Sequence, residues 1–308
     1  MAMKQGLVTT QEAFGKSGAD LERRIYQIGW TETPFLSTIQ TMAPADRSSS
    51  VSLGHQWFYD EIPDCDIDNA HNEGAAMADL KNYTGGSLKN HFQIVKNAYG
   101  VTGSEAAGNR IDGKKQLAVQ GELSSHVHKR TIEKILVSDQ AAVQRVNSAN
   151  TAGKCGGLKS FLTSSNKVDA GGSELSWQMI LDLLKVGFLK GRPYKILMMG
   201  DNQKDRLDFL LEKKQQATMD TNYLGVNVQT LKSTSYGSNI KILLNPYLEN
   251  NEIIAYNPED IVKVNWRPME VKSRVTTDDK ELKEIISEFT LRVCTPYAFC
   301  ALQSLKAN

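Results

Sequence analysis

The most regular hydrophobic pattern lies in the middle of the chain and predicts an amphipathic helix. Ser176 stands where a helix N-cap is expected, and Gly191 with Pro193 ends the pattern. Between them the apolar residues follow i, i+3, i+4, i+7 spacing: Trp177, Ile180, Leu181, Leu184 and Phe188.

Short apolar runs follow this helix and predict strands. They lie at residues 195–199, 226–231, 240–244 and 253–256. Asp201 and Asn202 can cap a further helix between the first two runs. Helices and strands in this succession predict a compact α/β lobe. The glycine-rich, polar stretch before it, residues 153–172, is predicted to be a linker.

A second apolar stripe predicts one long helix. From Gly113 to residue 147 there is no proline, and the only further glycine is Gly121. The stripe is one-sided: Val119, Leu123, Val127, Ile132, Ile135, Leu136 and Val143. A helix of about 33 residues is about 50 Å long at 1.5 Å per residue. We expect it to be a scaffold element.

Alternating patterns predict strands on both sides of these helices. Phe58 and Ile62 alternate with Asp60, which indicates a half-buried strand at 55–62, paired with residues 90–96. The intervening loop of about 25 residues exceeds the roughly 12–15 that compact domains tolerate, so we expect it to be either disordered or shaped by something outside its own domain, a first indication of a partner subunit. Further strands are predicted at residues 261–266, 270–275 and 288–293.

Composition excludes several classes of protein. The 308 residues carry 36 Lys and Arg against 35 Asp and Glu, a net charge of +1, whereas nucleic-acid binders usually show a basic excess. No apolar run approaches the roughly 20 residues of a membrane span. The four cysteines are scattered and predict reduced thiols in a cytosolic environment: Cys65, Cys155, Cys294 and Cys300.

Only weak matches to catalytic or ligand-binding motifs occur. Residues 108–115 fit G-x-x-x-x-G-K, but Lys115 stands where a phosphate loop needs Ser or Thr, and no apolar strand precedes them. His126 and His128 lie two residues apart and point to different helix faces. The acidic run at 60–68 lacks the glycine of a calcium loop. The sequence predicts no catalytic, cofactor-binding or metal-binding residue, no cofactor, and a protein that is not an enzyme.

The order of short segments along the chain resembles the major capsid proteins of tailed bacteriophages. The resemblance extends over nearly the whole chain and is to the Hong Kong 97-type fold, within it a group typified by a podophage coat protein. The segments are TPFLSTI at 33–39, HQW at 55–57, NEG at 72–74, NHFQI at 90–94, TGS at 102–104, KRTIE at 129–133, SDQAA at 138–142, GGL at 156–158, LMMG at 197–200, WRPME at 266–270, DDK at 278–280 and EFTLRV at 288–293.

The resemblance implies an α+β fold in five parts. Residues 1–50 would be an N-terminal arm, 51–102 an extended-loop hairpin, and 103–175 a peripheral domain with a spine helix at about 113–147. Residues 176–250 would be an axial α/β domain, and 251–308 would be C-terminal strands completing the peripheral domain. We expect the arm and the extended loop to become ordered only against neighbouring subunits.

The resemblance also implies function and partners. The chain would assemble into hexamers and pentamers of an icosahedral head that encloses double-stranded DNA, contacted non-specifically. A separate scaffolding protein, a portal and a decoration protein would be further partners, with assembly in the host bacterial cytoplasm and no membrane contact. An encapsulin-like compartment subunit is the main alternative, and a P-loop nucleotide-binding protein a weaker one.

We expect the contacts between subunits to lie on and around the extended loop. The expected contact residues are Trp57, Tyr59, Glu61, Glu73, Lys81, Tyr83, Lys89 and Phe92.

Overall fold

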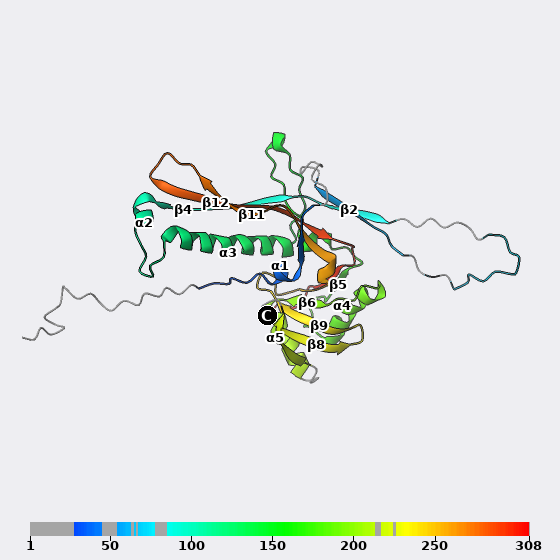
Figure 1. The fold of residues 1–308 in the computed structure, drawn as a ribbon. Helices are drawn as coiled ribbons and strands as arrows, with labels where there is room; N and C mark the ends of the chain where they lie inside the picture. The colour runs from blue at the N-terminus through cyan, green and yellow to red at the C-terminus, as the bar shows by residue number, and fades with distance from the viewer. Residues whose placement is uncertain are drawn as a thin grey trace, which may run out of the picture.

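The computed structural model describes residues 28–44, 54–62, 65, 67–77, 85–212, 217–223 and 226–307. Two sheets and two principal groups of helices make up the body, and a long hairpin extends from it to the right in Figure 1. Much of the N-terminal arm predicted at 1–50, namely residues 1–27 and 45–50, lies outside the described residues.

The first sheet has four strands in the order β1-β11-β12-β4. The strands are β1 (Gln40–Met42), β11 (Ile261–Arg274), β12 (Lys280–Val293) and β4 (Gln93–Thr102). β11, β12 and β4 run antiparallel, and β1 pairs in parallel with β11 at the edge. The short helix α2 (Gly103–Ala107) follows β4, and the long helix α3 (Gln116–Val137) lies along one face of the sheet (Figure 1).

Helix α3 has 22 residues, so the prediction of a helix over 113–147 was wrong in its extent. Ser138 is extended and ends the helix. Beyond it the chain bends back on itself, with antiparallel bridges from Val143 to Lys154 and from Val146 to Thr151. Val143 continues the apolar stripe in sequence, but its backbone is hydrogen bonded across this projecting excursion instead of along a helix.

The second sheet has seven strands in the order β5-β13-β10-β6-β9-β8-β7. They are β5 (Lys167–Asp169), β13 (Phe299–Gln303), β10 (Ile253–Tyr256), β6 (Ile196–Met199), β9 (Gly237–Leu244), β8 (Val226–Thr234) and β7 (Ala217–Tyr223). Helices α4 (Trp177–Leu189) and α5 (Asp201–Glu212) flank it (Figure 1). The predicted amphipathic helix is confirmed: Ser176 Oγ accepts a hydrogen bond from the Met179 amide at 3.3 Å, and Ile180 and Leu184 are buried. Phe188, which was also predicted on its apolar face, is instead exposed.

The residues after 250 are divided between the two sheets. β11 and β12 join the four-stranded sheet, as expected, whereas β10 and β13 lie inside the seven-stranded sheet. Residues 251–308 therefore do not all complete the sheet that carries α3. The predicted linker at 153–172 is also part of the body, since Cys155 and Leu158 are fully buried and β5 pairs with β13.

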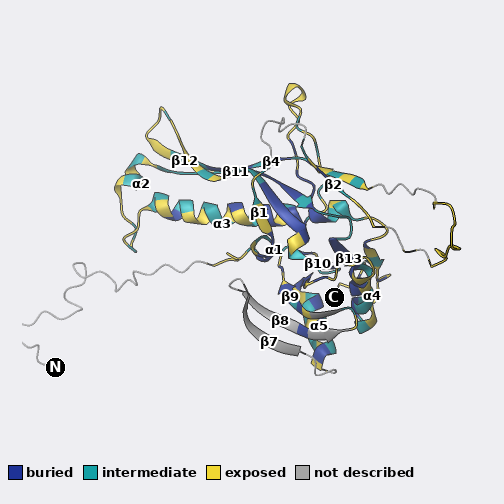
Figure 2. Ribbon diagram, turned by 45° about the vertical axis from the view of Figure 1, so that its right-hand side comes forward, coloured by how far each residue is buried: buried dark blue, intermediate teal, exposed yellow. Residues whose placement is uncertain are grey.

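One apolar core joins the two sheets. Phe289 and Leu291 of β12 meet Ile132 and Leu136 of α3, and the same cluster includes Tyr256 of the seven-stranded sheet. Figure 2 shows buried residues gathered where the two sheets meet. The short helix α1 (Pro34–Thr38) inserts into this core, and the single turns η3 (Leu158–Phe161) and η4 (Pro258–Asp260) lie at its margins.

The hairpin is formed by β2 (His55–Tyr59) and β3 (Gly86–Asn90), which pair from His55 with Asn90 to Tyr59 with Gly86. The sequence had predicted residues 90–96 as the partner of this strand. The pairing is displaced because the residues after Asn90 belong to β4, whose Val95 packs into the core together with the adjacent Phe92.

Candidate assembly surface

The extended loop, residues 54–90, is anchored firmly at its root. Trp57 is only 8% exposed, and its indole Nε1 donates a hydrogen bond to the Val293 carbonyl at 2.7 Å. Asn90 is fully buried, and its Nδ2 donates to the carbonyls of Leu291 (2.8 Å) and Gly156 (3.0 Å). Its Oδ1 accepts from the Gly156 amide at 2.7 Å. The direction in which the loop leaves the body is thereby fixed.

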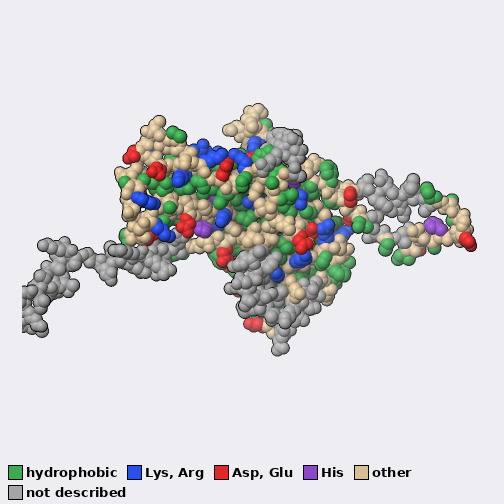
Figure 3. Space-filling view, in the orientation of Figure 1, with side chains coloured by type: hydrophobic (Ala, Val, Ile, Leu, Met, Phe, Trp, Pro, Cys, Tyr) green, Lys and Arg blue, Asp and Glu red, His purple; other side chains and the backbone are tan. Residues whose placement is uncertain are grey.

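Beyond this root, the loop presents large apolar side chains to solvent. Successive residues of a strand point to opposite faces, so inward Trp57 places Phe58 outward. The exposed fractions are 78% for Phe58, 92% for Ile62, 94% for Ile67 and 81% for Met77. Hydrophobic side chains are visible along the loop at the right of Figure 3. Exposed apolar surface gathered on one element is typical of an interaction site.

A cavity of about 520 Å³ lies where the loop meets the end of α4. Glu61 accepts a hydrogen bond from Lys190 at 2.8 Å, and the Lys190 ammonium stands 4.8 Å from the centre of the Tyr297 ring. Ile62 and Leu189, both exposed, line the same cavity. The ion pair holds the loop against α4, and the apolar rim is open to a partner.

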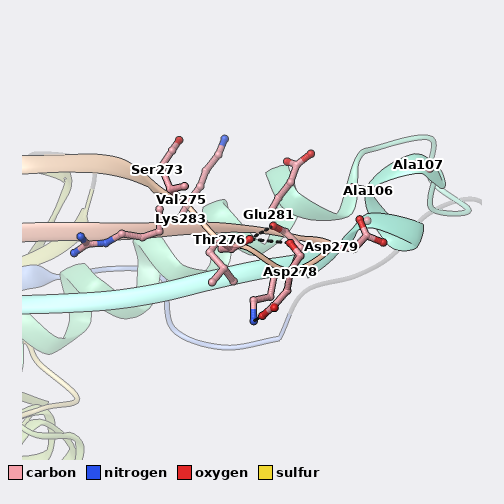
Figure 4. Close-up of a pocket in the computed structure, with 13 residues that line it drawn as sticks. Ala106, Ala107, Ser273, Val275, Thr276, Asp278, Asp279, Glu281 and Lys283 are labelled. Atoms are coloured by element: carbon pink, nitrogen blue, oxygen red, sulfur yellow. Dashed lines mark hydrogen bonds and ion pairs between the residues drawn. The ribbon is translucent and has the colours of Figure 1, made fainter.

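A second hollow, of about 770 Å³, lies at the opposite end of the molecule, between α2 and the tip of the β11–β12 hairpin (Figure 4). The hairpin turn is held by Thr276 Oγ1, which donates to the carbonyls of Asp278 and Lys280. Its apex, Val275, is fully exposed. The lining carries charges of both signs, as expected for a surface hollow rather than a site for one ligand.

The structure divides the predicted contact residues into three groups. Trp57 and Phe92 are buried inside their own subunit, so they hold the loop's root and have no surface to offer a neighbour. Tyr59 is half-buried against its partner strand, where a Cβ at Gly86 would lie 2.5 Å from its hydroxyl. Glu61, Glu73 and Lys89 are exposed. Lys81 and Tyr83 lie outside the described residues.

The apolar residues that the loop exposes were not among the predicted contact residues: Phe58, Ile62, Ile67 and Met77. The pattern of Phe58, Asp60 and Ile62 predicted a half-buried strand at 55–62, but the strand ends at Tyr59 and both apolar side chains are exposed. The alternation of Trp57 and Phe58 reveals that two faces exist, but which face is inward depends on the hydrogen bond from the Trp57 indole to Val293, a residue 236 positions away.

The motifs considered for catalysis have structural roles. Lys115 Nζ donates to the carbonyls of Ala106, Ala107 and Gly108 at 3.2–3.4 Å, and helix α2, rather than an apolar strand, precedes this turn. His128 is buried between Asn97 and Ser287 at 2.7 Å from each, and burial lowers its pKa. Among the described residues, no cluster of three His, Cys, Asp or Glu side chains suits a metal ion.

None of the described helices combines the length and the apolar character that a membrane span needs.

Comparison with solved structures identifies the fold. The chain is similar to the SrpI encapsulin of Synechococcus elongatus PCC 7942, with a TM-score of 0.66 and 11% identity over 97% of this chain and 96% of that one. It is also similar to the capsid of Myoviridae phage XM1 (TM-score 0.59, 13% identity, 98% and 100% covered). A third match is Microbacterium phage Oxtober96 (0.60, 11%, 96% and 99%). The fold is the Hong Kong 97-type capsid fold.

Fold similarity at this level of identity does not separate a phage capsid from an encapsulin, but the sequence itself does. No curated protein matches the sequence. The family model of the SU10 major capsid protein, by contrast, matches residues 4–306, nearly the whole chain. The chain therefore belongs to the SU10 major capsid protein family.

Proposed function

We propose that this capsid protein builds its shell by covering the apolar surface of each extended loop with neighbouring copies, in hexamers and pentamers of an icosahedral phage head. The observation that carries the proposal is the combination of a rigid root, at Trp57 and Asn90, with exposed apolar side chains further out. A subunit that stayed alone would leave these side chains in water.

The free energy available from burying these apolar side chains is large enough to contribute to association. Burying one large apolar side chain contributes roughly 1.5–3 kcal/mol, so four contribute about 6–12 kcal/mol before association costs are met. Each contact is modest after those costs. A closed shell repeats the contact around every subunit, and ring closure converts modest contacts into a stable assembly.

Within this proposal, the two sheets with their helices have different positions in the shell. The four-stranded sheet with α3 corresponds to a peripheral domain with its spine helix, and the seven-stranded sheet with α4 and α5 to an axial domain around the five-fold and six-fold centres. The head would enclose double-stranded DNA, with a separate scaffolding protein, a portal and a decoration protein as further partners. Assembly would take place in the host bacterial cytoplasm, and the subunit would catalyse no reaction.

An encapsulin-like compartment is the second candidate, favoured by the fold similarity to the Synechococcus protein. The content of particles purified from the natural source separates the two proposals. Double-stranded DNA supports the phage head, and an enzyme cargo without DNA supports the compartment.

A charge at Phe58 tests the proposed contact. We expect Phe58→Asp to fold with unchanged stability, because the side chain is exposed, but to lower the yield of particles at least tenfold in sedimentation and electron microscopy. Gln56→Asp is the matched control, since Gln56 is exposed on the same face of β2 two residues earlier. Normal particles from Phe58→Asp would exclude this surface from the assembly contact.

A further inference from the structure

One buried carboxylate joins three separate segments of the chain. Glu133 of α3 is fully buried. Its Oε1 accepts hydrogen bonds from the Phe35 amide at 2.7 Å and from Asn245 Nδ2 at 2.8 Å, and its Oε2 accepts from the Leu36 amide at 2.7 Å. Phe35 and Leu36 belong to α1, and Asn245 directly follows β9. The N-terminal segment, the long helix and the seven-stranded sheet thus meet at one side chain.

The apolar side of α1 makes a second connection to the seven-stranded sheet. Phe35 is fully buried and packs edge-on against Tyr256 of β10, with ring centroids 5.3 Å apart. Thr38 Oγ1 and the Tyr256 hydroxyl are hydrogen bonded at 2.7 Å. The N-terminal amides of α1 are therefore bonded to α3, and the side chains of Phe35 and Thr38 contact β10.

The residues after α1 are attached to the other sheet. β1 pairs with β11 from Gln40 with Val262 to Met42 with Val264. Residues 34–42 consequently contact α3 and β11 on the four-stranded side and β10 on the seven-stranded side, while Glu133 itself bonds to Asn245 at the end of β9. This nine-residue segment, here named the keystone, is inserted between the two halves of the molecule.

We infer that docking of the keystone fixes the angle between the two sheets, with Glu133 as the positioning residue, and that its release allows the two halves to hinge. The inference rests on the proposed function, in which one chain fills both five-fold and six-fold positions and therefore meets two different sets of neighbours. The keystone lies at the point where a change of angle between the halves is permitted or blocked.

The ionised carboxylate of Glu133 can accept every hydrogen bond offered to it at the junction. All three groups that bond to Glu133 are donors: two backbone amides and a carboxamide nitrogen. A glutamine of the same shape would place its own NH₂ donor against at least one of them. No ion pair to Glu133 occurs in the described part of the chain. Its bonds to the Phe35 and Leu36 amides are therefore made when the keystone is docked and lost when it leaves, whereas the bond from Asn245 does not involve the keystone.

Isolated full-length subunits carrying Glu133→Gln provide the test. Spin labels at Val127 of α3 and Glu212 at the end of α5, both exposed, report the distance between the halves. The background carries Cys65→Ser and Cys294→Ser, because Cys65 is exposed and Cys294 is half-buried. Hydrogen exchange follows the amides of residues 34–42. Glu122→Gln, an exposed position on the same helix, is the control.

We expect Glu133→Gln to raise keystone exchange at least tenfold and to double the width of the label distance distribution, with less than a twofold change of either in Glu122→Gln. Faster exchange with an unchanged distance distribution would overturn the inference, since the keystone would then be only an anchor for the arm. If Glu133→Gln does not fold, Thr38→Val removes the hydrogen bond between α1 and Tyr256, and the same two changes are required of it.

The outcome is separable from that of the proposed function. Shell formation by the unmodified chain is scored independently by electron microscopy. Normal shells, together with an unchanged distribution of spin-label distances in the variants, contradict the inference alone. Failure of the unmodified chain to form shells contradicts the proposed function alone.

Discussion

Burial of Glu133 has a consequence for the pH dependence of stability. Burial raises its pKa to about 7, although the bonds from Leu36, Phe35 and Asn245 act in the opposite direction. In the unfolded chain a glutamate titrates near its ordinary value of about 4.3. Between these two values the folded state binds more protons than the unfolded state, so this group's contribution to stability is lost as the pH rises towards 7.

We expect this contribution to disappear in Glu133→Gln. When the pH rises from 5.5 to 8, the unfolding free energy of the unmodified protein should fall by about 2 kcal/mol more than that of the variant. Denaturant titration at the two pH values measures it. Equal pH dependence in the two proteins would show that Glu133 titrates normally.

Lys263 is a second buried ionisable group, and burial shifts its pKa downwards, whereas burial shifts the pKa of Glu133 upwards. It lies within the sheet beneath α3, with its ammonium 5.3 Å from the centre of the Phe289 ring, and burial lowers its pKa to about 8. No carboxylate forms an ion pair with it among the described residues. We expect Lys263→Met to raise the unfolding free energy at pH 7 by about 1–2 kcal/mol, because the cost of burying a charge is removed.

The matched control for this variant is Lys185→Met, at an exposed position of α4, where we expect a change within about 0.5 kcal/mol. Thermal or denaturant unfolding measures both. Destabilisation by Lys263→Met would mean that the lysine has a stabilising partner in the folded protein.

At the scale of single residues, the sequence indicates the type of each side chain but not whether it is buried in the folded protein. Trp57 and Phe92 were recognised as large aromatic residues near the loop, yet both are buried in their own subunit. The burial of Glu133 and Lys263 could not be predicted from the sequence. Glu133 is buried by a segment more than 90 positions away along the chain, and Lys263 by strands that pair only in the folded protein. Burial of a charge becomes visible only when tertiary contacts are known.

At the scale of elements, the stability of the extended loop's root depends on the hydrogen bonds of one buried side chain, Asn90. Asn90 → Ala would leave the Gly156 amide and the carbonyls of Gly156 and Leu291 without the side chain that bonds them. We expect a loss of about 2–4 kcal/mol in unfolding free energy, since buried polar groups would be unsatisfied. Thermal unfolding measures the loss.

Ser87→Ala is the control, because Ser87 is exposed on the same strand, and it should have almost no effect. A change in Asn90→Ala no larger than that in Ser87→Ala would show that the root is held by the Trp57 side alone.

Elements defined by local periodicity were predictable, and those defined by distant pairing were not. The helix from Trp177 needs only its own spacing and the cap at Ser176, and both are present in the sequence. The end of α3 depends on the bridge between Val143 and Lys154, and the sheet that receives β13 depends on pairing with β10. Periodicity does not specify which strand a given strand will pair with.

At the scale of the whole molecule, the two sheets share one core, as in an ordinary globular protein. The extended loop sets this subunit apart, because it carries apolar side chains that its own body does not cover. Resemblance in the order of short segments was sufficient to predict the capsid family and the fold. The positions of the uncovered side chains required the structure.

Electron microscopy of the pure full-length chain at high concentration tests the central claim most directly. The expected result is closed shells, in which density over residues 67–77 comes from a second copy of the chain. A sample that remains strictly monomeric, with those residues packed against their own body, would contradict it.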